Sequence, residues 1–204
     1  GALASTPARY IFGDERDRWA LSAGTEGDPW ELAKARQATF YNKKAVEVST
    51  PTIKGRSNIE ASFYRGTQER WCHQCPECGA WHDIRFDAIK FDFETQEVNR
   101  KKSYTITSIG WACPSCGCLT PEDKMRKQPA KWIAENPEAY KRGVRSFWLN
   151  AFANGEIARL HCGDQRLLGK FGGAHLAPGV ERNAVLRRHI VPSAEIIVRV
   201  VRPH

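Results

Sequence analysis

At 204 residues the chain is long enough for one domain with its own core and a small appendage. It contains no run of about eighteen apolar residues, which excludes a membrane-spanning helix. Its 31 Lys and Arg against 23 Asp and Glu give a net charge of +8, which permits binding to a polyanion but also fits an ordinary solvated surface.

The first predicted elements alternate between strand and helix. The apolar run Tyr10–Phe12 stops at an acidic cluster, which is typical of a buried strand that ends in a loop. Asp28 and Pro29 then form a helix start, and we expect a helix from there through about Phe40. Residues 44–48 are the next predicted strand. This order predicts a parallel sheet with a crossover helix, and so an α/β fold.

Two short loops share the pattern C-P-x-C-G, the first at residues 75–79 and the second at residues 113–117. Each presents a C-x2-C pair, and two such pairs supply the four thiolates of a tetrahedral structural zinc site. The Gly permits the positive φ that aims both sulfurs at one ion. We therefore predict a β zinc ribbon whose Zn2+ is held by Cys75, Cys78, Cys113 and Cys116.

Three cysteines lie outside the repeated pattern. Cys72 extends the first loop towards a ferredoxin-type run, but the next position that such a run needs is His82. Cys72 and Cys118 are bystanders or alternate ligands, and Cys162 is an ordinary thiol. A disulfide framework is disfavoured because the cysteine count is odd and no apolar signal segment opens the sequence.

Between the two cysteine loops the pattern predicts short strands, at Ile84–Phe86, Phe91–Phe93 and Tyr104–Ile109. The acid-free run at residues 140–150 is expected to return the chain to the main core.

The composition changes near residue 154. The last fifty residues are rich in Arg and His and contain one aromatic residue of the Phe, Trp and Tyr class, Phe171. Such a change indicates a truncation, a junction or a shifted reading frame, with a separate small module as the alternative. The arginines of this tail, including Arg187, Arg188 and the run Arg199 to Arg202, could bind nucleic acid, whereas Ile196–Val201 has the pattern of a plain β-strand.

Chemistry is expected where the first strand ends, because ligands of parallel sheets bind at the carboxyl ends of the strands. A strand that runs into Asp14 and Glu15 has the form of a Walker B element. Asp14 would hold Mg2+ through a water, and Glu15 would deprotonate the water that attacks the γ-phosphate of ATP. The alternative is that both acids are loop or capping residues.

Several motifs together resemble the large terminase subunit of tailed phages, GpA type. They follow the order of that family: Pro7–Tyr10, Asp14 and Glu15 with Asp17, Gly27–Pro29, the run S-T-P-T at residues 49–52, Gly55, Ser57–Ile59, and the first cysteine loop. The resemblance covers about residues 1–150, and its most distinctive part is the S-T-P-T run followed by the C-P-x-C-G loops.

The resemblance implies a partial P-loop NTPase parallel sheet with an inserted β zinc ribbon. Asp14 and Glu15 would be the Walker B pair, and Ser49, Thr50 and Thr52 would form a coupling motif whose hydroxyls sense the γ-phosphate. Without the flanking matches, the same run would be an ordinary Ser/Thr-Pro turn.

Two parts of the family pattern have no counterpart. The phosphate-binding loop of the family precedes its Walker B strand, and residues 163–171 imitate such a loop only with a wrong spacing and a Phe in place of Ser or Thr. Residues 155–204 also lack the acidic cluster of the family's nuclease domain. We therefore expect no measurable ATP hydrolysis by the isolated chain.

Basic and aromatic residues surround the predicted ribbon: Lys54, Arg56, Arg65, Arg70, Arg85, Trp71, Trp81 and His82. They could contact DNA, or they could pack a ribbon that has little core of its own.

These observations predict four segments: residues 1–70 as partial ATPase domain, 71–120 as zinc-ribbon-like module, 121–154 as return to the ATPase core, and 155–204 as an atypical tail. The resemblance implies a fragment of an ATP-driven motor, with associated endonuclease in the complete protein, that packages double-stranded DNA into a capsid. Its partners would be the small terminase subunit and the portal or procapsid, in the cytoplasm of a bacterial host. The alternatives are a noncatalytic zinc ribbon that binds nucleic acid or protein, and an inactive prophage remnant.

Overall fold

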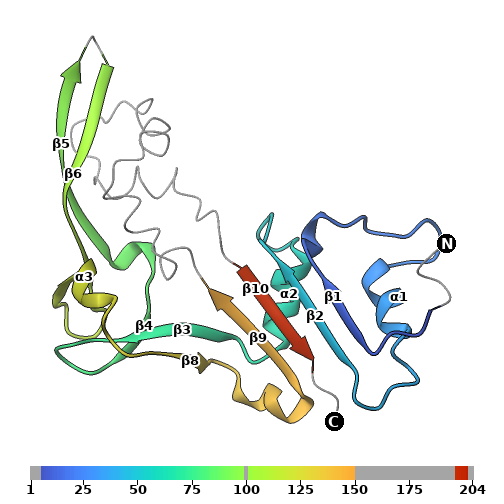
Figure 1. Cartoon of the computed structure of the whole chain (residues 1–204). Coiled ribbons are helices and arrows are strands. Elements are labelled where there is room, and N and C mark those ends of the chain that lie inside the picture. Colours follow the sequence, from blue (N-terminus) through green and yellow to red (C-terminus); the bar gives the residue numbers. More distant parts are fainter. Residues whose placement is uncertain (1–5, 99–100, 150–195, 202–204) are drawn as a thin grey trace. The chain divides into compact units, whose positions relative to one another are not determined.

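The computed structural model describes residues 6–98, 101–149 and 196–201 (Figure 1). Its contacts divide the chain into two compact units. The first unit comprises Gly1–Arg70, Trp132–Leu149 and Ala194–His204, and the second comprises Trp71–Lys131 and Asn150–Ser193. Most of the predicted tail, with Cys162 and residues 163–171, lies outside the described residues.

The first unit opens with the predicted strand, helix and strand. β1 (Tyr10–Gly13) pairs in parallel with β2 (Lys44–Ser49), so that Gly13 lies opposite Glu47. Between them come a short 3-10 helix, η2 (Arg16–Arg18), and α1 (Pro29–Ala35). The predicted parallel pairing is confirmed.

Helix α1 begins as predicted and ends earlier than predicted. The Asp28 carboxylate accepts a hydrogen bond from the Trp30 N–H at 2.9 Å, which caps the first turn. The helix ends at Ala35 rather than near Phe40. Beyond it the buried Gln37 side chain donates to the carbonyls of Arg9 and Lys44, which ties the chain to the strand starts and stops the helix.

The sheet of the first unit is mixed and not purely parallel. β10 (Ile196–Val201) runs antiparallel between β2 and β9 (Val144–Leu149), which gives the order β1-β2-β10-β9. β9 also pairs in parallel with Glu69 and Arg70 at the start of β3 (Glu69–Gln74). The predicted strand at residues 196–201 is confirmed, and η4 (Pro137–Arg142) and β9 belong to the first unit.

Helix α2 (Asn58–Arg65) packs on this sheet along β9 and β10 (Figure 1). Ile59 and Phe63 are fully buried against Trp148, and the Phe63 and Trp148 rings meet edge to face with centroids 5.2 Å apart. At the end of α2 the backbone approaches β9 so closely that a Cβ at Gly66 would lie 2.4 Å from the Ser146 Oγ. This contact fixes α2 on the sheet.

The second unit is built from β-hairpins. β3 pairs antiparallel with β4 (Trp81–Asp83) and also with β8 (Ala130–Ala134). β5 (Ile89–Val98), β6 (Lys101–Ala112) and β7 (Leu119–Pro121) form a three-stranded antiparallel sheet, which α3 (Glu122–Met125) follows. The predicted strands Phe91–Phe93 and Tyr104–Ile109 lie within β5 and β6 and are confirmed.

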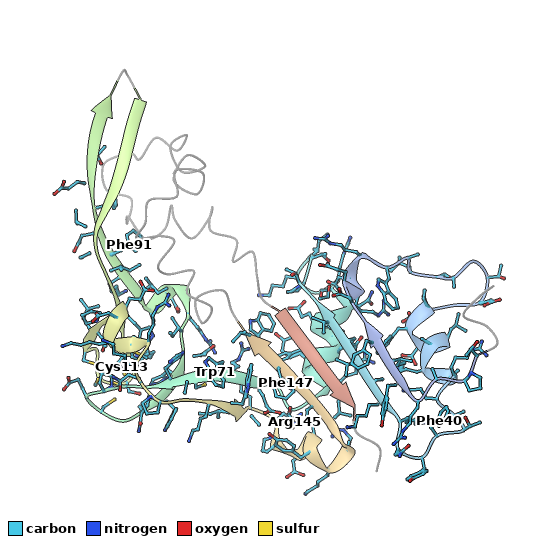
Figure 2. The ribbon with its side chains drawn as sticks, in the orientation of Figure 1. Phe40, Trp71, Phe91, Cys113, Arg145 and Phe147 are labelled. Atoms are coloured by element: carbon cyan, nitrogen blue, oxygen red, sulfur yellow. The ribbon has the colours of Figure 1, made fainter. Side chains whose placement is uncertain are left out.

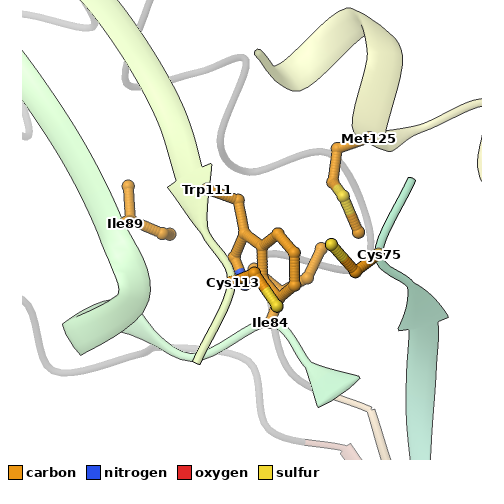
Figure 3. Close-up of a cluster of buried hydrophobic side chains, with 6 residues drawn as sticks. All are labelled: Cys75, Ile84, Ile89, Trp111, Cys113 and Met125. Carbon is orange, nitrogen blue, oxygen red and sulfur yellow. The ribbon is translucent and has the colours of Figure 1, made fainter. Parts of the chain in front are cut away.

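The strand predicted at Ile84–Phe86 is wrong. β4 ends at Asp83, and a 3-10 turn, η3 (Phe86–Ala88), follows. The Ile84 side chain is 5% exposed and packs into the core of the unit (Figure 3). The segment therefore turns inward to bury this residue, and it does not continue along the sheet.

The core of the second unit is small and contains two cysteines. Figure 3 shows its buried side chains, which are Cys75, Ile84, Ile89, Trp111, Cys113 and Met125. Trp111 is 1% exposed and is the largest of them. A core of this size buries little apolar area, so further stabilisation must come from elsewhere.

The described residues therefore form a mixed α/β structure with several sheets. None of the helices among them is both long and apolar enough to cross a membrane.

Candidate nucleotide site and candidate metal centre

The predicted acidic pair and the predicted coupling motif lie at one edge of the first unit's sheet. Asp14 and Glu15 directly follow β1, and Ser49 and Thr50 lie at the end of β2. Since β1 and β2 are parallel neighbours, both segments leave the sheet at its carboxyl edge, where ligands of parallel sheets bind.

Glu15 has an unusual backbone. Its φ of 52° and ψ of 42° lie in the left-handed region, which residues other than Gly rarely adopt. The bend is held by the Trp19 indole N–H, which donates to the Asp14 carbonyl at 2.7 Å, and by the Glu15 N–H, which donates to the Asp14 carboxylate at 2.9 Å. Both acidic side chains remain exposed, and the exposed Arg18 pairs with Glu15 at 3.2 Å.

The three hydroxyls of the coupling motif have different environments. The Ser49 hydroxyl is buried; it accepts from the Asp17 N–H and donates to the Thr50 carbonyl. The Thr52 hydroxyl donates to the Asp17 carboxylate at 3.1 Å. For the Thr50 hydroxyl, the described part of the chain offers no hydrogen-bond partner. Among the described residues, Thr50 is thus the member of the motif whose hydroxyl makes no hydrogen bond.

Asp17 connects the loop after β1 with the coupling motif, a role that its place in the family pattern did not indicate. Burial raises the pKa of its carboxyl group, but hydrogen bonds from Ser57, Ile59 and Thr52 outweigh burial and hold the pKa below its usual value. Asp17 is therefore a carboxylate at neutral pH. A lone acid in a polar loop carries no sequence signal for these contacts, which span 35 and 42 residues.

A buried ion-pair cluster also holds the loop that follows β1. Arg16 is 3% exposed; it binds both oxygens of Asp28 at 2.8 and 2.7 Å and lies 3.8 Å from the buried Glu47 of β2. Truncating one member of such a cluster leaves an unpaired charge, so the cluster fixes the loop after β1 to the strand beside it. Sequence reasoning missed it, because charged residues of a polar loop are expected at the surface.

The four predicted metal ligands come together in the second unit. The sulfurs of Cys75, Cys78, Cys113 and Cys116 all lie within 4.8 Å of one another. The Sγ atoms of Cys75 and Cys116 are 3.8 Å apart, and those of Cys78 and Cys113 are 3.7 Å apart. A tetrahedral ion with metal–sulfur bonds of about 2.3 Å separates its sulfurs by about 3.8 Å. These two separations are those of a tetrahedral zinc site, so the cluster could hold a metal ion.

The two loops that carry these sulfurs have the same backbone geometry. Gly79 has a φ of 72° and donates its N–H to the Cys75 carbonyl; Gly117 has a φ of 74° and donates to the Cys113 carbonyl. A second backbone hydrogen bond closes each loop: the Cys75 N–H donates to the Ala80 carbonyl, and the Cys113 N–H donates to the Cys118 carbonyl. The positive φ explains why each C-P-x-C motif ends in Gly.

The thiol pKa values differ around the cluster. Burial raises the pKa of Cys75, but the backbone N–H groups of Cys78 and Glu77 point at its sulfur, and its pKa is lowered to about 6. The N–H of Ala80 lowers the pKa of Cys78, yet burial and the neighbouring sulfurs raise it overall to about 12. The backbone N–H groups thus favour the thiolate form of Cys75, and a bound cation would favour the thiolate form of Cys78.

Of the three cysteines outside the motif, Cys72 and Cys118 lie among the described residues. The Cys118 sulfur is 3.3 Å from the Cys75 sulfur and 3.9 Å from the Thr120 hydroxyl, whereas Cys72 is buried on β3. Cys118 is therefore near enough to replace a ligand.

Several of the basic residues predicted near the ribbon have partners within the protein. Arg70 pairs with Glu135 at 2.7 Å and lies over the Trp148 ring, and Arg85 pairs with Asp83 at 2.9 Å. These contacts support the packing alternative over DNA contact for both arginines. Figure 2 shows the side chains around the labelled residues of each unit, with Trp71 on β3 and Cys113 at the cluster.

The comparisons with known proteins define the class of the chain. Residues 1–132 match the family model described as phage terminase large subunit gpA, ATPase domain. Because the match covers more than half of the chain, the chain belongs to this family of terminase ATPase domains.

A particular relative supports this assignment. The chain is similar to the terminase large subunit of Enterobacteria phage P21, with 27% identity over 138 residues, or 66% of this chain and 21% of that protein. The chain thus spans about a fifth of the length of this relative. No solved structure matches the chain.

Proposed function

We propose that this segment supplies the hydrolytic and coupling residues of a terminase motor that uses ATP to package viral double-stranded DNA. The supporting observation is the joint position of Asp14, Glu15 and the residues 49–52 at the carboxyl edge of parallel β1 and β2. In the complete subunit we expect an associated endonuclease, a small terminase subunit and a portal or procapsid as partners, and action in the cytoplasm of the bacterial host.

The acidic pair has the chemistry for this role. Exposed carboxylate oxygens are the ligands that Mg2+ prefers, so Asp14 would hold the ion through a water. Bound Mg2+ supplies positive charge that offsets the phosphates of ATP. The Glu15 carboxylate, held outward by its left-handed backbone, would take a proton from the attacking water. The Thr50 hydroxyl would bind the γ-phosphate.

We further propose that Cys75, Cys78, Cys113 and Cys116 hold one structural Zn2+. The sulfur separations and the paired loops support this proposal. Because the core of the second unit is small, a bound ion would contribute to the stability of that unit.

The function is tested with Glu15→Gln in a complete large subunit that carries these residues. The amide keeps the size of the side chain but cannot act as a base, so ATP should still bind while hydrolysis falls by about a thousandfold or more. Glu31→Gln, at an exposed glutamate that pairs with Lys34 on α1, is the matched control and should leave turnover unchanged. Parental turnover in Glu15→Gln would exclude the proposed catalytic role.

A further inference from the structure

Asp17 is the residue on which three segments of the first unit converge. Its Oδ2 atom accepts hydrogen bonds from the Thr52 N–H at 3.0 Å and from the Thr52 hydroxyl at 3.1 Å. Its Oδ1 atom accepts from the Ile59 N–H at 2.9 Å, and its own N–H donates to the Ser49 hydroxyl at 3.1 Å. One residue thus connects the loop after β1 with the chain after β2 and with the start of α2.

The contact with α2 reaches a rigid part of the unit. The first N–H groups of a helix have no partner inside the helix, and Asp17 supplies a charged acceptor for the Ile59 N–H while the Ser57 hydroxyl accepts from the Glu60 N–H. Ile59 is fully buried against the sheet. Any displacement of the Asp17 carboxylate is therefore passed to a packed helix and not to a loose surface segment.

The contact with Thr52 reaches the coupling motif itself. Both bonds to Thr52 use the same carboxylate oxygen, so the backbone and the side chain of Thr52 follow Asp17 together. Asp17 also donates a hydrogen bond to the same motif, from its N–H to the Ser49 hydroxyl. Asp17 lies two residues after Glu15, whose backbone is held in the left-handed conformation.

A comparison with Asp28 shows that this arrangement is more than a helix cap. Asp28 also accepts from an N–H at the start of a helix, the Trp30 N–H of α1, and binds Arg16. The contacts of Asp28 hold α1 and the buried ion-pair cluster, whereas those of Asp17 extend to the segment that follows the neighbouring parallel strand.

We propose that Asp17 is the positioning residue that transmits a change at Asp14 and Glu15 to the coupling motif and to α2. This inference rests on the proposed function of those residues. Asp17 touches neither nucleotide nor metal in this scheme; it acts through Thr52 and Ile59.

The test uses Asp17→Asn in a complete large subunit that carries these residues. The amide retains the shape of the side chain but loses the charge and one acceptor oxygen. ATP turnover should stay within about threefold of the parent, whereas the DNA moved for each ATP hydrolysed should fall by about tenfold or more. Glu31→Gln, at the exposed pair with Lys34 on α1, is the control, and its ratio of DNA moved to ATP hydrolysed should equal that of the parent.

A second measurement reports on the contacts directly. In this chain, Asp17→Asn should raise the amide hydrogen exchange of Thr52 and Ile59 by about tenfold or more, because each loses a charged acceptor, while the amides that pair β1 with β2 stay protected. If Asp17→Asn gives too little folded protein, Thr52→Val removes only the hydroxyl at the other end of the contact and should lower the same ratio.

The outcomes separate this inference from the proposed function. Suppose that Glu15→Gln abolishes hydrolysis but that Asp17→Asn or Thr52→Val moves as much DNA for each ATP hydrolysed as the parent. This result would overturn the inference and leave the proposed function intact. Unchanged exchange at both amides would overturn it as well. Parental hydrolysis in Glu15→Gln would overturn both.

Discussion

Glu15 is one of two described residues other than Gly with a positive φ, the other being Gln68, and its strained backbone supports the role proposed for the acidic pair. Left-handed backbone costs a residue with a Cβ about 1–2 kcal/mol, and a strand end could avoid that cost with Gly. The exposed Arg18 pair is worth little, so it does not compensate. The strain is understandable if the carboxylate is needed at this position, as the proposed role requires.

This strain predicts an inverted order of stability for two variants. At most positions Ala is more stabilising than Gly, but at a left-handed position Gly has no steric cost. Glu15→Gly should therefore be more stable than Glu15→Ala by about 1 kcal/mol, measured by urea unfolding of this chain. Both variants lack the carboxylate, so the difference reports only the backbone. A more stable Ala variant would show that Glu15 is not strained.

At the scale of elements, the sequence predicted those features of the fold that depend on residues close together in the chain. The cap at Asp28, the strands β1 and β2, and the closely spaced cysteines of each loop all depend on residues a few positions apart. The end of α1 depends instead on Gln37 reaching two strands, and Ile84 leaves β4 to fill a core. Such tertiary causes have no periodic signature.

The cysteine loops predict a metal dependence confined to the second unit. Because the core there is small, the free energy of metal binding should contribute to its folding. The reduced chain should carry about one equivalent of zinc by metal analysis, and Cys113→Ser should release it and expose the Trp111 region to hydrogen exchange.

The control variant is Cys72→Ser, which should retain the ion. Cys118→Ser tests whether Cys118 is an alternate ligand. Zinc should be lost from that variant only if Cys118 binds the ion in place of one of the four motif cysteines. Properly reduced protein without zinc would contradict the proposed site.

At the scale of the whole molecule, an ion pair between residues far apart in sequence joins two strands of the first unit. The buried Glu69 of β3 binds Arg145 of β9 through both of its oxygens and accepts from the Thr67 hydroxyl at 2.7 Å. Arg145 also lies over the Phe147 ring, with 4.6 Å to its centroid (Figure 2). The pair spans 76 residues, so no local pattern could have revealed it.

This ion pair predicts how stability depends on pH. Burial raises the pKa of Glu69, but Arg145 and Thr67 outweigh burial and hold the pKa below its usual value. Since the folded pKa lies below the unfolded one, the pair stabilises the protein fully above the unfolded pKa, and this contribution is lost as the pH falls through the folded pKa. Glu69→Gln should lower the free energy of unfolding by about 2–4 kcal/mol at pH 7, and by progressively less in acid. Glu138→Gln, at an exposed pair with Lys141, should change it by less than about 0.5 kcal/mol. Urea unfolding between about pH 3 and pH 7 measures both, and a constant difference between Glu69→Gln and the parent across that range would show that Glu69 does not bind Arg145 as a carboxylate.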